Sequence, residues 1–138
     1  MSRLEVGTEL PSRSVLITEE YIHRYGIASH DDNPIHRDGT AARNSGLPGI
    51  IAHGMLSMGV LGSRASAWAG GSQYVRGMSC RFVNIVRPGD TLTFAGTVGD
   101  IVDGVVTAGV SVTNHRGEEV LAKAIVEFEL QPPDIMIA

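Results

Sequence analysis

The sequence predicts an α+β fold in which a curved antiparallel β-sheet is wrapped around a long central helix. Residues 53–69 form an apolar stretch rich in small residues, which is long enough for one helix. After residue 70, apolar and polar residues alternate over long stretches, and turn signals interrupt them at residues 87–90, 103–104 and 115–118. Strands joined by short turns are antiparallel neighbours, so we expect a four-stranded meander beside the helix.

The first third of the chain carries signals for one short strand and one amphipathic helix. Residues 14–17 are a candidate strand, and Thr18 is a good N-cap for a helix over residues 18–29, with two glutamates in its first turn. The Asn33-Pro34 dipeptide ends that helix. A short helical turn is expected over residues 40–43, before the central helix.

The central helix contains Gly54, Gly59 and Gly62, and each interior glycine costs about 1 kcal/mol relative to alanine. We expect close approach of the sheet to compensate, since small residues let a helix and a sheet pack tightly. The helix is apolar nearly all round, which is typical of a helix covered on all sides. The last strand should end at Pro132-Pro133, and one domain over residues 1–138 accounts for all these elements.

Composition and charge exclude several classes of function. The net charge of −4 argues against general nucleic-acid binding. No apolar stretch reaches the length of a bilayer span, and the N-terminus lacks the apolar core of a secretory signal, so we expect a cytoplasmic location. Cys80 is the single cysteine, which excludes an internal disulfide and predicts a packed thiol on a buried strand face.

The stretch from Asp31 to His36 places a carboxylate and an imidazole five positions apart on a turn that Pro34 stiffens. Such a pair suits general acid/base catalysis. Downstream, Gly54 opens the central helix, whose first backbone N–H groups and positive dipole end can stabilise an oxyanion. By spacing alone, however, an Asp31 that caps a turn and a His36 at the surface are the more common arrangement.

A metal site is the alternative from another class. His36-Arg37-Asp38, together with His53 or His115, matches the two-histidine, one-carboxylate set of non-haem iron oxygenases. Such sites need a barrel of strands around the metal, whereas this triplet precedes the strand-rich half and is followed by a helix. The order of the elements therefore disfavours a metal site.

Residues 25–38, which run from Tyr25 through Ser29, Asp31 and His36 to Asp38, resemble the hydratase motif Y-x-x-x-S-G-D-x-N-P-x-H-x-D of MaoC-like proteins. These are the (R)-specific enoyl-thioester hydratases and 3-hydroxyacyl-thioester dehydratases. The similarity continues through residues 52–56, 81–82 and 87–92, so it covers nearly the whole chain. It looks closest to the catalytic subunit type of the actinobacterial fatty-acid dehydratases.

The resemblance implies the hotdog fold and the interconversion of (R)-3-hydroxyacyl and trans-2-enoyl thioesters on coenzyme A or acyl carrier protein. It implies no metal or redox cofactor, and a homodimer or a heterodimer with a related hotdog subunit. Asp31 and His36 become the catalytic pair, Asn33 the residue that orients them or their water, and Gly54 the donor to the thioester carbonyl. Substrate contacts are expected from His53, Met55, Ser57, Arg76, Arg81 and Arg87.

The three arginines come from a stretch without acidic residues. No Asp or Glu occurs from Gly39 to Gly89. Two further arginines, Arg43 and Arg64, fall within the same stretch. Because the coenzyme A phosphates and the carrier-protein surface are negative, a chain of net charge −4 needs local positive charge near its substrate. Arg64 is a weaker candidate than Arg76, Arg81 and Arg87, since it lies near the far end of the helix from Gly54.

Two positions depart from the family pattern, and other functions remain open. His30 stands where the motif often has glycine, and Gly59 where some relatives carry a serine that bonds the catalytic aspartate, for which Ser57 is a candidate substitute. The scaffold could serve another dehydration or a cyclisation in polyketide metabolism, or be an acyl-binding subunit, although such subunits are expected to lose the Asp/His pair. A hotdog thioesterase would need a carboxylate on the central helix, and residues 53–69 have none.

Overall fold

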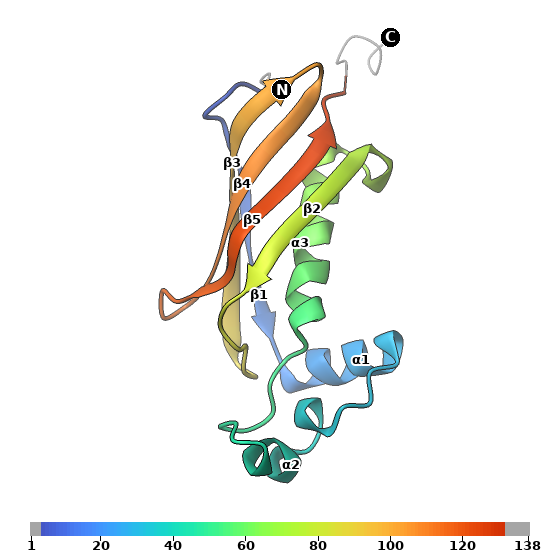
Figure 1. Ribbon diagram of the computed structural model, residues 1–138, viewed down its shortest axis with the longest axis vertical. Coiled ribbons are helices and arrows are strands. Elements are labelled where there is room, and N and C mark those ends of the chain that lie inside the picture. The colour runs from blue at the N-terminus through green and yellow to red at the C-terminus, as the bar shows by residue number, and fades with distance from the viewer. Residues whose placement is uncertain (1–3, 132–138) are drawn as a thin grey trace.

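The computed structural model describes residues 4–131, and its main feature is one curved sheet of five antiparallel strands (Figure 1). In chain order, the strands are β1 (Glu9–Ile17), β2 (Val75–Phe82), β3 (Asp90–Val102), β4 (Val105–Asn114) and β5 (Glu119–Glu129). They lie side by side in the order β1-β3-β4-β5-β2. The helices are α1 (Glu19–Ser29), α2 (Gly39–Asn44) and α3 (Gly54–Ala69), with short 3₁₀ turns η1 (Pro34–His36) and η2 (Ser72–Tyr74). The predicted α+β class is confirmed.

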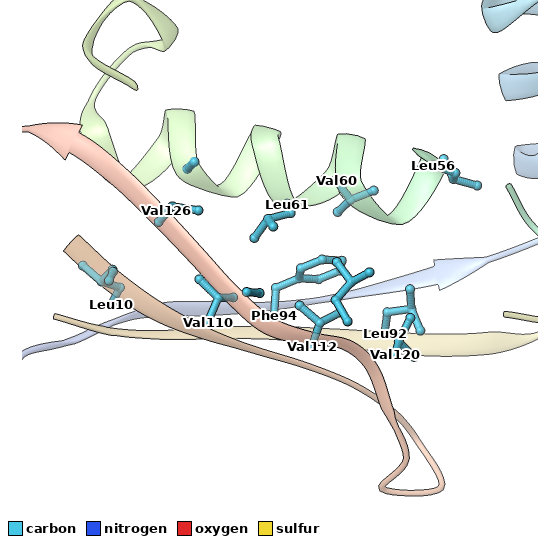
Figure 2. Close-up of a cluster of buried hydrophobic side chains, with 14 of the residues drawn as sticks. Leu10, Leu56, Val60, Leu61, Leu92, Phe94, Val110, Val112, Val120 and Val126 are labelled. Carbon is cyan, nitrogen blue, oxygen red and sulfur yellow. The ribbon is translucent and has the colours of Figure 1, made fainter. Parts of the chain in front are cut away.

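The hydrophobic core lies between α3 and the sheet face that α3 covers. Successive side chains of a strand point to opposite faces, and β3 accordingly buries Leu92, Phe94 and Val98. Figure 2 shows Leu61 of α3 facing Phe94 across the space between helix and sheet. The period-two pattern of the sequence therefore identified these three inward-facing residues correctly, but it also placed Val102 on that face, which is 57% exposed at the end of β3.

The predicted four-stranded meander is wrong in one respect. β3, β4 and β5 are successive antiparallel neighbours, but β2 pairs with β5 and not with β3. The turn at residues 87–90 exists, with the Asp90 N–H donating to the Arg87 carbonyl, but it belongs to a connection that crosses the end of the sheet. β1 occupies the edge of β3 that a meander would have given to β2.

The N-terminal elements are confirmed, apart from the start of β1. β1 begins at Glu9 instead of residue 14, and its register against β3 shifts between Leu10 and Arg13. Pro11 lies in that irregular segment, where its missing N–H costs no ladder bond. Thr18 caps α1 as expected, because its hydroxyl oxygen accepts the Tyr21 N–H at 3.0 Å.

α3 is covered on one side only within this chain, so the prediction of a fully wrapped helix is wrong for a single chain. The positions buried against the sheet include Leu56, Val60, Leu61 and Ala65, and the exposed positions are Gly54, Met55, Gly59, Ser63 and Ala67. Close approach is found at Gly62, where an added Cβ would lie 3.4 Å from the Met78 methyl group of β2. Gly59 faces open space, so close packing does not compensate its cost.

A buried carboxylate fixes the start of β3. Asp90 accepts hydrogen bonds from the Arg87 N–H at 3.0 Å and from two guanidinium nitrogens of Arg116 at 2.9 and 3.2 Å. Burial would raise the pKa of Asp90, but the bonds from Arg116 and Arg87 outweigh it and hold the pKa below its usual value. The carboxylate thereby ties the connection after β2 to the β4–β5 turn.

We expect Asp90→Asn to lower the free energy of unfolding at neutral pH by about 1–3 kcal/mol, because it weakens the charge-assisted bonds of a buried group. A carboxylate whose pKa folding lowers adds stability above its unfolded pKa of about 3.9, and this stability is lost as the pH falls through the folded pKa. The difference in free energy of unfolding between variant and wild type, measured with denaturant, should therefore become smaller below about pH 4. Asp103→Asn, at an exposed turn position, is the control and should change neither the free energy of unfolding nor its dependence on pH. A difference that stays constant down to low pH would contradict this account of Asp90.

Three further expectations concern the ends of the chain, the membrane and the thiol. Within residues 4–131, no helix is both long and apolar enough to span a membrane. Cys80 is half-buried on β2 and packs against the core, and burial raises the pKa of its thiol. The strand end expected at Pro132-Pro133 and the first three residues of the expected domain lie outside the described residues.

Candidate active site

Asp31 lies just after α1, where the chain turns sharply. His30 ends α1 in the left-handed conformation, with φ 59° and ψ 29°, and the Asp31 N–H donates back to the Gly26 carbonyl. A left-handed residue is strained unless it is glycine, which explains the glycine of the family motif at this position. The Asn33 N–H donates to Asp31 Oδ1 at 3.0 Å, and this bond leaves Oδ2 for other partners.

Two hydrogen bonds fix His36 on the η1 turn: one holds the backbone of the turn and the other holds the His36 ring. Asn33 Oδ1 accepts the Ile35 N–H at 3.3 Å and caps η1, so Asn33 orients the turn that carries His36. His36 Nδ1 lies 2.8 Å from the Ile51 carbonyl oxygen. Because a carbonyl oxygen only accepts, Nδ1 carries the proton, and Nε2 of neutral His36 presents a lone pair.

The carboxylate and the imidazole face each other across a gap. Asp31 Oδ2 and His36 Nε2 are 4.0 Å apart. Both atoms are acceptors when Asp31 is ionised and His36 is neutral, so they cannot bond to each other directly. A water molecule has two protons to donate and fits two acceptors at this separation. The pair is therefore arranged to hold a water and to move its protons.

The first backbone N–H of α3 lies beside this pair. Gly54 is the first residue of α3, and its N-cap His53 makes no side-chain capping bond. Among the described residues, no acceptor for the Gly54 N–H is found, so this N–H is free to bind an oxyanion at the positive end of the helix dipole. An added Cβ at Gly54 would lie 3.2 Å from Phe82 Cδ1, so a side chain here would have to displace that ring.

A cavity of about 270 Å³ joins these groups. His36, His53, Gly54 and Ser57 line it, and its mainly apolar wall consists of residues 82–86, which begin with the last residue of β2 and include the polar Asn84, with Val120 and Leu121. Asp31 does not line the cavity, but its Oδ2 lies 4.0 Å from Nε2 of His36, a residue that does. The cavity thus offers an apolar space next to a carboxylate–imidazole pair and a backbone N–H for which the described residues provide no acceptor.

His53 is the buried member of the cluster. Its side chain is 4% exposed, its ring stacks on His36 with centroids 3.8 Å apart, and Tyr25 of α1 contacts it edge-on. Burial and, second to it, the neighbouring His36 lower the pKa of His53, against an opposing effect of Asp31. His53 is therefore neutral at physiological pH.

The structure brings some of the expected substrate contacts to the cavity and leaves others apart. Ser57 is buried and lines the cavity, whereas Met55 is 55% exposed on the outer side of α3. Neither Arg81 nor Arg87 lines the cavity: both are exposed, and each is only the chain neighbour of a wall residue, Phe82 or Val86. β2 begins beside the end of α3 that is far from Gly54 (Figure 1), and Arg76, the second residue of β2, pairs with Glu129.

The iron-type ligand set considered for the sequence is not assembled. Asp38 caps α2 by accepting the Thr40 and Ala41 N–H groups, and His115 lies in the β4–β5 turn, where it accepts the Thr91 N–H. A different set, Asp31, His36 and His53, has its ligand atoms within 4.8 Å of one another. Its two imidazoles are stacked at 23° with centroids 3.8 Å apart, so their in-plane lone pairs lie in two separate, nearly parallel planes, whereas an ion bound by both rings must lie close to both planes. This geometry fits a metal ion poorly.

Sequence reasoning missed two contributions to the site. The Ile51 carbonyl sets the tautomer of His36, and a backbone group leaves no mark on the sequence. Residues 82–86 form the apolar wall, and the available signal was an apolar run that lacks the period of a strand or a helix.

Both the sequence and the fold match known proteins. Residues 4–120 match the family model described as MaoC like domain. The (R)-specific enoyl-CoA hydratase of Rhodospirillum rubrum is 36% identical over 117 residues, covering 82% of this chain and 76% of that protein. The 3-oxo-4,17-pregnadiene-20-carboxyl-CoA hydratase beta subunit of Mycobacterium tuberculosis is 27% identical over 117 residues, covering 85% and 91%.

Structural similarity extends over almost the whole chain. A chain of the ChsH1-ChsH2 complex from Mycobacterium tuberculosis superposes with a TM-score of 0.84 at 26% identity, covering 94% of this chain and 100% of that one. Other relatives are far longer, since this chain spans only 4% and 3% of the fatty acid synthase beta subunits of Aspergillus oryzae and Saccharomyces cerevisiae. The expected hotdog fold is confirmed, and the chain belongs to the MaoC-like dehydratase family.

Proposed function

We propose that this protein is a carbon–oxygen lyase that interconverts trans-2-enoyl and (R)-3-hydroxyacyl thioesters. The observation that carries the proposal is the 4.0 Å gap between Asp31 Oδ2 and His36 Nε2, next to the free N–H of Gly54. Adding water to a conjugated thioester needs a proton-transfer pair and a donor to the carbonyl oxygen. The names of the two hydratase relatives support this reaction class.

In the hydration direction, the Gly54 N–H donates to the thioester carbonyl oxygen and polarises the conjugated double bond. The water between Asp31 and His36 adds its oxygen to C3, and the pair takes one of its protons as the double-bond electrons move toward C2 and the carbonyl. The pair then returns one proton to C2, so the enzyme ends in the protonation state in which it began. Dehydration follows the same steps in reverse, without a covalent intermediate.

The substrate carrier is coenzyme A or an acyl carrier protein in this proposal. The apolar wall of residues 82–86 holds the acyl chain, and Arg81 and Arg87 on either side of it attract the negative carrier. Arg76 is too far along β2 to share that task. A cytoplasmic location, where such thioesters are made and used, stays a prediction.

The experiment that tests the proposal follows the enoyl absorbance of crotonyl-CoA with the purified protein. We expect the absorbance to fall without any added metal or redox cofactor, and (R)-3-hydroxybutyryl-CoA to give the reverse change. Protein carrying Asp31→Asn, purified in the same way, controls for contaminating hydratases. Absence of turnover on short and long enoyl-CoA and enoyl-carrier substrates would overturn the proposal.

Charge reversal at the cavity wall tests carrier binding. Arg81→Glu should raise the KM for crotonyl-CoA up to about tenfold, and more at low salt, because a favourable long-range attraction becomes repulsive. Arg76→Glu is the matched control on the same strand, at the opposite end of α3, and should leave the KM unchanged. A short uncharged thioester should not distinguish the two variants. Equal effects of both variants on crotonyl-CoA would contradict a docking role for Arg81.

We infer that the chain works as a dimer, with itself or with a related hotdog subunit. Met55 on α3 is 55% exposed, and Phe82, Val83 and Ile85 beside the cavity are 52%, 45% and 41% exposed. Among the described strands, β2 has a partner on one side only. Exposed apolar side chains and an open strand edge are both features that a partner covers. The complex of two named components in the solved structure supports this.

Sedimentation velocity should therefore show a dimer for the chain alone or after addition of its partner subunit. Met55→Asp should weaken that dimer, because it places a charge on the face to be covered. Val102→Asp, which places the same charge on a 57% exposed apolar residue at the end of β3, is the control. A stable monomer with full hydratase activity would contradict the inference.

A further inference from the structure

His53 poses a problem of hydrogen bonding. Its side chain is 4% exposed, yet neither Nδ1 nor Nε2 has a hydrogen-bond partner among the described residues. Buried polar groups are almost always hydrogen-bonded, because an unmade bond costs the full desolvation of the group. An unpartnered imidazole next to a proton-transfer pair therefore needs a functional explanation.

The ring of His53 is held in place on several sides. It stacks on His36 at an interplanar angle of 23°, and Tyr25 of α1 meets it at 61°. Gly26 of α1 lies against the ring, and a Cβ there would make an ordinary contact with it at 3.5 Å. This packing directs Nε2 toward Asp31 Oδ2, at 4.0 Å.

Asp31 in turn lacks a donor on the side that faces His53. Its Oδ1 accepts the Asn33 N–H, whereas no donor to Oδ2 is found among the described residues. His36 cannot supply one while neutral, because its proton is on Nδ1 and is donated to Ile51. Ser57 makes no hydrogen bond to Asp31 in the described structure, and Gly59 faces open space. His53 is the remaining candidate for the task that a serine performs in some relatives.

Neutral His53 carries a single proton, and the charge around it decides where that proton lies. The titratable groups that face its ring are Asp31 after α1, His36 on η1 and Tyr25 on α1. Asp31 is the group among them that carries negative charge, and the nitrogen of His53 that its Oδ2 faces, at 4.0 Å, is Nε2. The tautomer with the proton on Nε2 is therefore favoured, and this proton points at Oδ2.

We propose that His53 is a positioning residue whose Nε2–H donates to Asp31 Oδ2 as substrate and water fill the cavity, and so holds the carboxylate in the orientation that contacts the reacting water. At 4.0 Å the two atoms are not yet hydrogen-bonded, and catalytic hydrogen bonds often tighten only when substrate is bound. This role rests on the proposed hydratase function. It differs from a direct contact with the acyl chain, because His53 acts through Asp31.

Two substitutions separate this role from a structural one. His53→Phe keeps the aromatic stack and removes both nitrogens, whereas His53→Gln loses the stack and keeps an N–H donor near the position of Nε2. A positioning role predicts that Phe lowers kcat by about 10–100-fold, with KM within about threefold, and that Gln restores at least a tenth of the wild-type kcat. A structural role predicts the opposite order, because phenylalanine packs better than glutamine in an apolar site.

The pH profile gives a second readout. A hydrogen bond to the charged form of a carboxyl group lowers its pKa, so losing the bond raises it. The acid limb of kcat/KM should therefore move to higher pH in His53→Phe and stay near wild type in His53→Gln. Thermal unfolding of both variants would show whether either loss of activity is a loss of fold.

The results separate failure of the inference from failure of the proposed function. If wild-type protein hydrates crotonyl-CoA and folded His53→Phe matches it in kcat and acid limb, His53 does not position Asp31. The same holds if Phe exceeds Gln in kcat. If the wild type itself has no hydratase activity, the proposed function fails first, and the role of His53 fails with it.

Discussion

Asp31→Asn is expected to lower kcat/KM for hydration of crotonyl-CoA by about 10²–10⁴-fold, because it removes a proton-transfer partner. The fold should remain intact, since the asparagine oxygen can still accept the Asn33 N–H that now bonds Asp31 Oδ1. His36→Asn should cause a similar loss, because the amide keeps a donor for the Ile51 carbonyl and provides no base. Steady-state kinetics with the folded variants measure both effects.

The matched control for these variants is Asp32→Asn. Asp32 is the adjacent exposed carboxylate, and its backbone carbonyl, not its side chain, accepts the Arg37 Nε–H. The variant changes the local charge by the same amount as Asp31→Asn and should keep nearly wild-type kcat. Near-wild-type turnover by folded Asp31→Asn would exclude the acid/base role.

Gly54→Pro is expected to lower kcat by about 10²–10³-fold, because it deletes the N–H that stabilises the developing oxyanion. The helix should tolerate proline here, since Gly54 is the first helical position and proline is common there. The preceding residue also fits, because His53 has φ −63° and ψ 136°, within the extended region that a residue before proline adopts. Circular dichroism and kinetics together separate loss of the donor from loss of the helix.

Gly54→Ala is the control for the side-chain atoms that proline adds. Its Cβ meets the Phe82 ring at 3.2 Å, as any Cβ does at this position, but its N–H remains. The ring is 52% exposed and can move by a few tenths of an ångström, so we expect kcat within about tenfold of wild type. Equal losses in the alanine and proline variants would mean that crowding of Phe82, and not the N–H, is responsible.

The parts of the fold that depend on local signals could be predicted from the sequence. Thr18 and the residues that follow it specify α1, and the period-two pattern specifies β3, β4 and β5 with their tight turns. Asp31, His36 and Gly54 could be assigned because the residues around them resemble the hydratase motif of the family, whereas spacing alone favoured a turn cap and a surface histidine. The structure brings these three residues to one cavity or its edge.

The remaining features depend on contacts between distant parts of the chain. β2 pairs with β5 because β1 takes the free edge of β3, and no local pattern records that competition. For the same reason, sequence order alone could not separate Arg81, near the cavity wall, from Arg76 at the other end of the same strand. The sequence predicted that the exposed side of α3 is buried, because the residues on that side are small or apolar. Within residues 4–131, nothing covers them.

The central claim is that Asp31 and His36 add one water molecule across the C2–C3 bond of an enoyl thioester. The most direct measurement is hydration of crotonyl-CoA in D₂O, followed by mass and chiral analysis of the recovered product. We expect the wild type to give (R)-3-hydroxybutyryl-CoA with one deuterium bonded to C2, and Asp31→Asn to give no such product. A product of the S configuration, or a free acid released by thioester cleavage with the double bond intact, would contradict the central claim.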